Sequence, residues 1–270
     1  MNPVVVERGS GPVVLGFPHA GTWLPPEVAT RLTDSARRLI DTDWHVDQLY
    51  AGLLPEATTV RANFHRYLID ANRDPEGVSL YPGQNTTGLV PVTDFDGQPL
   101  WHHAPAQVEI DQRLHAWHQP YHRQLEAELA RAQEQHGVAV LLDCHSIRSR
   151  IPFLFDGQLP DLNLGTDGGV TCDRRIEAVA SDICDQATDY TWVLNGRFRG
   201  GWTTRHYGQP ARGRHALQLE LAQSTYLADE RETFAMDSDK SQRLRIVLKQ
   251  LLESLQRLAV ELADAAKERS

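Results

Sequence analysis

A run of six residues, VAVLLD at 138–143, limits the folds open to this chain more than any other feature. Gly137 precedes the run, and a long segment with helical periodicity, 106–136, precedes the glycine. A short continuous apolar run of this kind is typical of a strand that is buried on both faces. Such strands belong to parallel sheets with helices on either side. The run therefore predicts an α/β protein.

The rest of the chain alternates between strand and helix patterns. Further strands are expected at 12–17, 58–62, 66–69, 191–194 and 215–221. Helices are expected at 33–54, 106–136, 173–187 and 241–267. Pro120 should kink the second of these helices. Alternation of this kind indicates a mixed, mainly parallel sheet with helices on both faces.

A segment at 74–104 is rich in Gly, Pro, Asn and Thr and has no clear periodicity. Long excursions of this kind in compact enzymes are often functional. The chain of 270 residues is long enough for one large catalytic domain, and we expect a single domain over 1–270.

Composition narrows the expected partners and the compartment. The formal net charge of -9 argues against a nucleic-acid partner, because phosphate binding favours a basic surface. Three cysteines without a CxxC pair favour a reducing compartment, so we expect a cytoplasmic protein. We see no signal peptide and no apolar stretch of about 18 residues, so no membrane partner is expected. The composition leaves the oligomeric state open.

Two histidines follow predicted strands, His19 after 12–17 and His145 after 138–143. Ligands of open α/β sheets bind beyond the carboxyl ends of the strands. Neutral imidazole is the commonest zinc ligand, and a carboxylate often completes the set. The sequence thus favours a metal site that contains both histidines. Asp43 and Asp47, four residues apart on one predicted helical face, are both candidates for the carboxylate.

Other polar residues lie at the same edge of the predicted sheet. Asn72 and Arg73 come shortly after the strand predicted at 66–69, and Glu220 lies in or at the end of 215–221. Several arginines also lie near strand ends or in glycine-rich loops: Arg66, Arg73, Arg148, Arg150, Arg197, Arg199 and Arg205. Because arginine forms paired hydrogen bonds with carboxylates, this set predicts a small anionic substrate.

Competing interpretations are weaker. His118 and His122 are four residues apart, but they lack the Glu of an HExxH motif and enclose Pro120. We interpret them as helix surface, with one or two residues reaching the cleft. Ser146 has no GxSxG context, and Cys144 should point to the side of its strand opposite His145, into the core.

Eight short segments in order resemble one known family. They are PHAGTWLP, DTDWHVDQLY, RYLIDANRDPEG, LYPGQNTTGLVP, YHRQL, LLDCHS, NGRFRGGWTTRHYG and LQLEL. Together, over about 18–221, they resemble the N-formylglutamate deformylase (N-formylglutamate amidohydrolase) family. That family is similar to the zinc carboxypeptidases and aspartoacylases, so the resemblance implies a phosphorylase/hydrolase-like α/β fold and one zinc ion.

The resemblance also implies a ligand set and a catalytic pair. His19, an aspartate and His145 would hold Zn²⁺, although other divalent ions fit such ligands. The HxxE pattern of the wider group is absent here, because Ala-Gly-Thr follows His19. Asp43 is favoured over Asp47 as the acidic ligand. Glu220 would be the catalytic carboxylate, and Arg66 would polarise the scissile carbonyl.

The remaining roles implied by the resemblance concern the substrate. Asn72 and Arg73 would bind a substrate carboxylate, and Arg197, Thr203 and Arg205 in the loop 196–208 would bind the glutamate end. The expected reaction is hydrolysis of N-formyl-L-glutamate to formate and L-glutamate, the last step of a histidine degradation route. The alternative is a zinc deacylase or carboxypeptidase-like hydrolase of another N-acyl amino acid or peptide.

Overall fold

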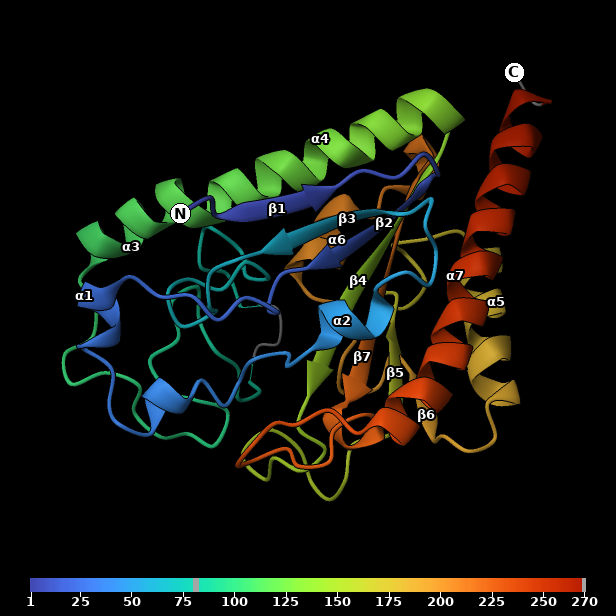
Figure 1. Ribbon diagram of the computed structural model, residues 1–270. Helices are drawn as coiled ribbons and strands as arrows, with labels where there is room; N and C mark the ends of the chain where they lie inside the picture. Colours follow the sequence, from blue (N-terminus) through green and yellow to red (C-terminus); the bar gives the residue numbers. More distant parts are fainter. Residues whose placement is uncertain (80–82, 269–270) are drawn as a thin grey trace.

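A single mixed sheet forms the centre of the protein in the computed structural model, which describes residues 1–79 and 83–268 (Figure 1). Its seven strands in the described chain are β1 (Val4–Glu7), β2 (Val13–Phe17), β3 (Thr58–Ala62), β4 (Ala139–Ile147), β5 (Leu162–Gly165), β6 (Trp192–Leu194) and β7 (Arg214–Ala222). The helices are α1 (Pro26–Ala29), α2 (Val46–Tyr50), α3 (Gln107–Arg113), α4 (Gln119–His136), α5 (Arg174–Gln186), α6 (Trp202–Tyr207) and α7 (Ser238–Lys267).

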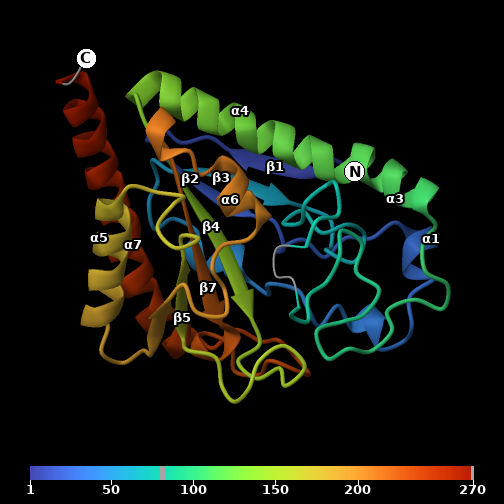
Figure 2. The ribbon, with the colours of Figure 1, turned by 180° about the vertical axis from the view of Figure 1, so that it is seen from behind.

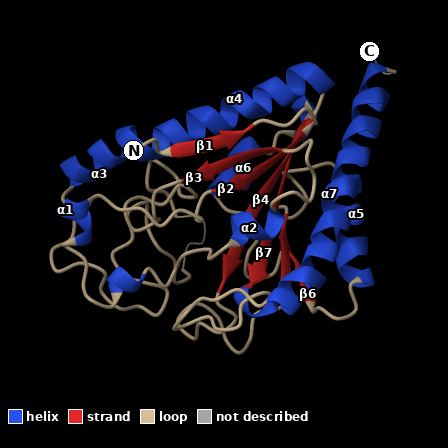
Figure 3. Ribbon diagram, viewed as in Figure 1, coloured by secondary structure: helices blue, strands red, loops and turns tan. Residues whose placement is uncertain are grey.

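The strands are arranged in the order β1-β3-β2-β4-β7-β5-β6 (Figure 3). The central strands β3, β2, β4 and β7 are parallel, and β5 and β6 are parallel to each other. Antiparallel pairing occurs where β1 joins β3 and where β5 joins β7. The predicted mixed and mainly parallel sheet is therefore confirmed, and β4 lies at its middle.

Helices cover both faces of the sheet. Alternate residues of β4 belong to opposite cores, because successive side chains of a strand point to opposite faces. Leu141 packs with Tyr121, Leu125 and Leu129 of α4 on one face. Leu142 packs against the other core, which α7, α5 and α2 supply. Figure 1 shows α2 in front of the sheet, and Figure 2, from the opposite side, shows α6 in front of it.

The prediction of one helix over 33–54 is wrong. The structure has only a short 3₁₀ turn at Ala36–Arg38 and the helix α2 in that range. Leu39 and His45 have positive φ angles of 54° and 58°, which are incompatible with a continuing right-handed helix. The Asp43 N–H instead donates to His19 O at 3.2 Å. Tertiary contacts thus override the apolar periodicity of this segment.

The long helix predicted at 106–136 is present but contains a π-helical turn, Leu114–His118, between α3 and α4. The turn lies just before Pro120, where a kink was predicted. Pro120 supplies no N–H to the helix ladder, so the hydrogen bonding must change near this position.

Other boundaries also differ from prediction. The segment 66–69 forms turns instead of a strand, with the Leu68 N–H bonded to His65 O. β4 continues to Ile147, four residues beyond the predicted end, and β1, β5 and α6 were not predicted. The excursion predicted at 74–104 is irregular where it is described, and its residues 80–82 lie outside the described part.

None of the described helices is long and apolar enough to cross a membrane.

Candidate functional site

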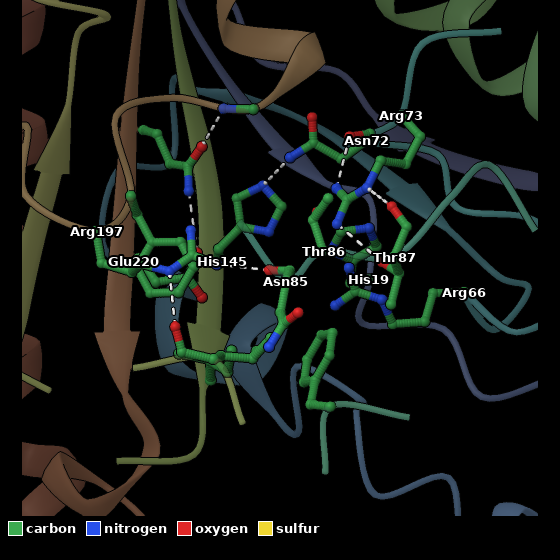
Figure 4. Close-up of a pocket in the computed structure, with 16 residues that line it drawn as sticks. His19, Arg66, Asn72, Arg73, Asn85, Thr86, Thr87, His145, Arg197 and Glu220 are labelled. Carbon is green, nitrogen blue, oxygen red and sulfur yellow. Dashed lines mark hydrogen bonds between the residues drawn. The ribbon is translucent and has the colours of Figure 1, made fainter. Parts of the chain in front are cut away.

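One cavity opens beside the carboxyl ends of β2, β4 and β7, where the sequence placed its candidate residues (Figure 4). His19 follows β2, whereas His145 and Glu220 lie within the last residues of β4 and β7. The side chains around the cavity are His19, Arg66, Asn72, Arg73, Asn85, Thr86, Thr87, Phe95, His145, Ile147, Leu154, Arg197, Phe198, Gln218 and Glu220, with Gly201. Most of these side chains are polar or charged, so the cavity can bind a small polar ligand.

His19, Asp43 and His145 form a compact buried group. In the part of the chain that the structure describes, a ligand atom from each lies within 4.8 Å of the other two. Asp43 Oδ2 lies 3.1 Å from His145 Nδ1 and 3.8 Å from His19 Nδ1. Two imidazoles and one carboxylate are a common donor set for a catalytic zinc ion. The group contains Asp43 and not Asp47, whose carboxylate lies 3.5 Å from Arg61 Nε.

The unpaired nitrogen of His19 is the observation that most favours a metal. His19 Nδ1 is buried and has no hydrogen-bond partner among the described residues. A buried polar atom without a partner costs free energy unless something binds it. Burial lowers the pKa of His19, and Arg66 adds to that effect, so the neutral imidazole is favoured. A neutral ring with a free nitrogen is the form that binds a metal ion.

Carboxylates lie on the far side of both imidazoles, but only Asp70 forms a hydrogen bond there, because Asp143 Oδ1 has no hydrogen-bond partner among the described residues. Asp70 Oδ1 lies 2.6 Å from His19 Nε2, and Asp143 Oδ1 lies 3.1 Å from His145 Nε2. Metal-binding histidines usually have such a partner, which fixes the ring orientation. Although burial disfavours its charge, Arg66 and Arg73 hold the pKa of Asp70 well below its usual range. Asp70 is therefore a charged partner for His19.

Asn72 also contacts His145. Asn72 Nδ2 lies 2.9 Å from His145 Nε2, and its Oδ1 accepts a hydrogen bond from the Thr203 N–H at 2.9 Å. The close approach of the loop before α6 requires a glycine at position 201. A Cβ on Gly201 would lie between 2.3 and 2.6 Å from atoms of the Asn72 amide. Gly201 thus allows the contact that orients Asn72.

Glu220 stands beside the histidine–aspartate group. It pairs in register with His145 across β4 and β7, and its Oε2 accepts a hydrogen bond from Gln218 Nε2 at 3.0 Å. Burial raises the pKa of Glu220 to about 7, against the lowering effect of His145. A carboxyl group with a pKa near neutrality can both accept and donate a proton, as a general acid-base catalyst must.

Three arginines line the cavity. Arg66 is buried, with Nη2 2.8 Å from Asp70 Oδ2 and its guanidinium 4.7 Å from the ring centroid of Phe95. Arg73 donates to Thr87 O and Oγ1, both at 2.9 Å. Arg197 donates from Nη2 to the Asn85 carbonyl at 2.9 Å. The segment 85–87 thus connects Arg73 and Arg197.

Two residues predicted to bind substrate do not line this cavity. The Arg205 guanidinium lies 3.2 Å from Asp167 and donates to Gly200 O at 2.9 Å. Thr203 is fully buried and supports Asn72 through its backbone. Both lie on α6, a helix that the sequence did not predict, and neither is among the residues that line the cavity.

The prediction for the histidine pair His118 and His122 is wrong, whereas the prediction for Cys144 is confirmed. His118 and His122 are not helix surface, since their exposed fractions are 2% and 8%, and neither belongs to the metal-ligand group. Cys144 packs in the core, as predicted.

Sequence reasoning assigned no role to several residues of the site. The most important is Asp70, which follows the segment 66–69 and carries the same strand-end signal as Asn72. Others include Asn85, Thr86, Thr87, Phe95 and Gln218. All but Gln218 come from the irregular excursion, where periodicity gives no indication of side-chain direction.

Taken together, the sheet and its site define a hydrolase-like α/β protein with a candidate metal centre at the carboxyl ends of its central strands. The model of the N-formylglutamate amidohydrolase family matches residues 11–227, most of the chain. The chain therefore belongs to the N-formylglutamate amidohydrolase family and is an amidohydrolase.

Similar proteins have matching names. The chain is 47% identical over 253 residues to the N-formylglutamate deformylase of Pseudomonas aeruginosa, covering 92% of this chain and 94% of the relative. It is 48% identical over 251 residues to the N-formylglutamate deformylase of Pseudomonas putida, covering 92% and 93%.

Two solved structures share the fold. The N-formylglutamate amidohydrolase of Ralstonia eutropha JMP134 superposes with a TM-score of 0.77 at 24% identity, covering 100% of both chains. A protein of Agrobacterium tumefaciens superposes with a TM-score of 0.71 at 20% identity, covering 99% of this chain and 97% of the other. At these identities the likeness concerns the fold alone.

Proposed function

We propose that this protein hydrolyses N-formyl-L-glutamate to formate and L-glutamate with the help of one zinc ion. The observation that supports this most is the position of His19, Asp43 and His145 beside Glu220 in an arginine-lined cavity. The names of relatives at 47% and 48% identity point to the same substrate.

His19, Asp43 and His145 are the residues that would hold the metal. The donor set suits zinc, and the unpaired His19 Nδ1 supports its occupation by an ion. When bound, zinc supplies a Lewis acid for an amide carbonyl and lowers the pKa of a coordinated water to about 7.

Glu220 is the proposed general base and acid. Its carboxylate takes a proton from the attacking water, which becomes the nucleophile toward the formyl carbon. The protonated Glu220 then gives that proton to the departing nitrogen of glutamate. Burial raises the pKa of Glu220 to about 7 and a bound cation would lower it, so the carboxylate is available as a base near neutral pH. Gln218, bonded to Glu220 Oε2, holds the carboxyl group in place.

Arginines would stabilise the negative charges of the reaction. Arg66 reaches the cavity beside Asp43, with Nη1 3.7 Å from Asp43 Oδ1, and is the proposed partner of the developing oxyanion. Asn72, Arg73 and Arg197 are the proposed partners of the substrate carboxylates. Since N-formylglutamate has two carboxylates, arginines on two walls suit it better than a single arginine. Thr203 and Arg205, which do not line the cavity, have no proposed contact with the substrate.

The wider context follows from the same assignment. We propose that residues 1–270 act as one catalytic domain in the cytoplasm, at the last step of a histidine degradation route. The alternative retains the zinc chemistry and changes the substrate to another N-acyl amino acid or peptide.

A substrate panel tests the proposal. The purified enzyme, with its metal content measured, is assayed with N-formyl-, N-acetyl- and N-succinyl-L-glutamate. We expect kcat/KM for the formyl compound to exceed the others by at least about tenfold, because even one methylene changes binding by ~1–3 kcal/mol. Equal values would favour the alternative. Full activity in protein shown to lack any metal would contradict the zinc assignment.

A further inference from the structure

Two buried histidines outside the metal-ligand group bind the backbone of the segment 70–73. The His122 Nε2–H donates to Ala71 O at 2.7 Å, and the His118 Nε2–H donates to Arg73 O at 3.0 Å. A carbonyl oxygen can only accept, so each ring must have its proton on Nε2 in these contacts. Both rings come from the helical segment 114–136 and reach the same loop from one side.

The segment 70–73 connects the metal-ligand group to the cavity wall. The Asp70 side chain holds His19, the Asn72 side chain contacts His145, and Arg73 lines the cavity. The backbone carbonyls of residues 71 and 73 in this segment accept the hydrogen bonds from the two histidines. Fixing these carbonyls therefore fixes the three side chains that lie between and beside them.

The π-helical turn presents both histidines to this loop. In that turn the Gln119 N–H bonds to Leu114 O, five residues earlier, so one extra residue is accommodated before Pro120. An extra residue rotates the helix after it by about 100° relative to the helix before it. His118 ends the turn and His122 lies one turn later, with ring centroids 4.4 Å apart. Single π-turns of this kind frequently occur at functional sites.

Trp202 connects the histidine pair to the other support of Asn72. Its ring centroid lies 5.7 Å from that of His118 and 4.7 Å from that of His122. Trp202 begins α6, and the next residue, Thr203, donates its N–H to Asn72 Oδ1. Asn72 is thus supported through its side chain by α6 and through its backbone neighbours by the histidines.

The surroundings keep the histidines neutral. Burial lowers the pKa of His118 and lowers that of His122 well below its ordinary value. Tyr207 Oη lies 3.1 Å from His122 Nδ1 and 3.2 Å from His122 O, and both atoms can accept its hydroxyl proton when the His122 proton is on Nε2. A neutral ring with one N–H suits a positioning contact, whereas a metal ligand needs a nitrogen with a free lone pair facing the ion.

We propose that His118 and His122 are positioning residues, which fix the backbone of 70–73 and thereby the groups that surround the metal and the substrate. The proposal rests on the proposed function for what those groups do. It assigns a role to a histidine pair that is neither a metal-ligand motif nor helix surface. The two contacts support different parts of the segment. His122 binds the backbone between Asp70 and Asn72, whereas His118 binds the backbone carbonyl of Arg73.

Paired substitutions test this role. Leucine at either position removes the N–H, whereas glutamine places an amide N–H close to the position of Nε2. His115→Leu is the control, because His115 is an exposed residue of the same turn. For each variant we would measure kcat and KM for N-formyl-L-glutamate, zinc affinity by chelator competition, and Tm.

We expect His118→Leu to raise KM by about tenfold, and His122→Leu to weaken zinc binding by about tenfold, the size expected from losing one buried hydrogen bond that orients other groups. His118→Gln and His122→Gln should recover most of each loss, and His115→Leu should match the wild type. If the leucine variants change Tm alone, or if glutamine recovers nothing at unchanged Tm, the positioning role is wrong.

These measurements also distinguish failure of the positioning role from failure of the proposed function. In the latter case the wild type itself would not hydrolyse N-formyl-L-glutamate. Zinc affinity and the amide hydrogen-exchange rates of residues 71–73 would still report on the contacts. We expect faster exchange there in both leucine variants than in the glutamine variants, and equal exchange would overturn the inference.

Discussion

His145 on β4 and Glu220 on β7 are direct neighbours in the register of two parallel strands. Side chains at paired positions of adjacent strands project from the same face. A candidate metal ligand and the candidate general base are therefore held side by side by backbone hydrogen bonds, in strands that are buried along nearly their whole length. Rigid placement of this kind keeps reacting groups in a productive arrangement.

Replacing Glu220 by glutamine should abolish most activity while leaving the metal bound. The amide keeps the size of the side chain but cannot accept a proton from water. We expect kcat to fall by about 10²–10⁴-fold, the usual contribution of a general acid-base group. Metal analysis of Glu220→Gln serves as the control. Near-normal turnover would remove Glu220 from the mechanism.

The pH profile of the same pair of proteins gives a second readout. Glu220 must be ionised to act as base, so kcat/KM should rise with pH as the carboxyl group loses its proton. Burial raises the pKa of Glu220 to about 7, and a bound cation would lower it. The acidic limb should therefore lie at or below about pH 7 and be missing from the residual activity of Glu220→Gln.

Asp70→Asn should weaken metal binding. The amide removes the negative charge that faces His19 Nε2 at 2.6 Å, so the imidazole becomes a poorer ligand. We expect a loss of about 10–100-fold in metal affinity or activity, as for other partners of metal-binding histidines. Asp47→Asn is the matched control, because Asp47 pairs with Arg61 outside the group. Equal effects of the two substitutions would argue against the role of Asp70.

Arg73→Lys should raise KM for N-formyl-L-glutamate. Lysine keeps the charge but cannot form the paired hydrogen bonds of a guanidinium with a carboxylate. We expect KM to rise by about tenfold or more, as a charged hydrogen bond is worth ~1.5–3 kcal/mol. Arg205→Lys, at a side chain that does not line the cavity, should leave KM unchanged. If Arg205→Lys raised KM and Arg73→Lys did not, Arg205 would be the residue that binds the substrate.

Gly201→Ala should disturb the site through Asn72. The added methyl group would meet the Asn72 amide at 2.3–2.6 Å, so either the amide or the loop before α6 must move. We expect kcat/KM to fall by about 10²-fold, the scale of an ångström-sized misplacement at an active site. The comparison is Gly88→Ala, where an added Cβ has only Val90 O near it, at 4.0 Å. Wild-type kinetics for Gly201→Ala would show that Asn72 tolerates displacement.

The central strands and the positions of the main candidate residues could be predicted from sequence. Apolar runs such as 138–143 must be buried on both faces, and polar residues at their ends must collect at one edge of a parallel sheet. That rule was enough to select His19, His145 and Glu220, which line the same cavity. Asn72 and Arg73 also line it, but the segment 66–69 before them forms turns and not the predicted strand.

Other features depended on the tertiary structure. The segment 33–54 has the apolar spacing of a helix, yet a positive φ at His45 and a hydrogen bond to His19 place Asp43 in the group and leave Asp47 near Arg61. The local sequence pattern also could not predict the side-chain directions of Asp70, Arg205 and the histidine pair. The burial of a strand is a property of its own residues, so the sequence alone determined it. The direction of a side chain in a turn or after a π-turn depends on contacts with distant residues, which only the folded chain decides.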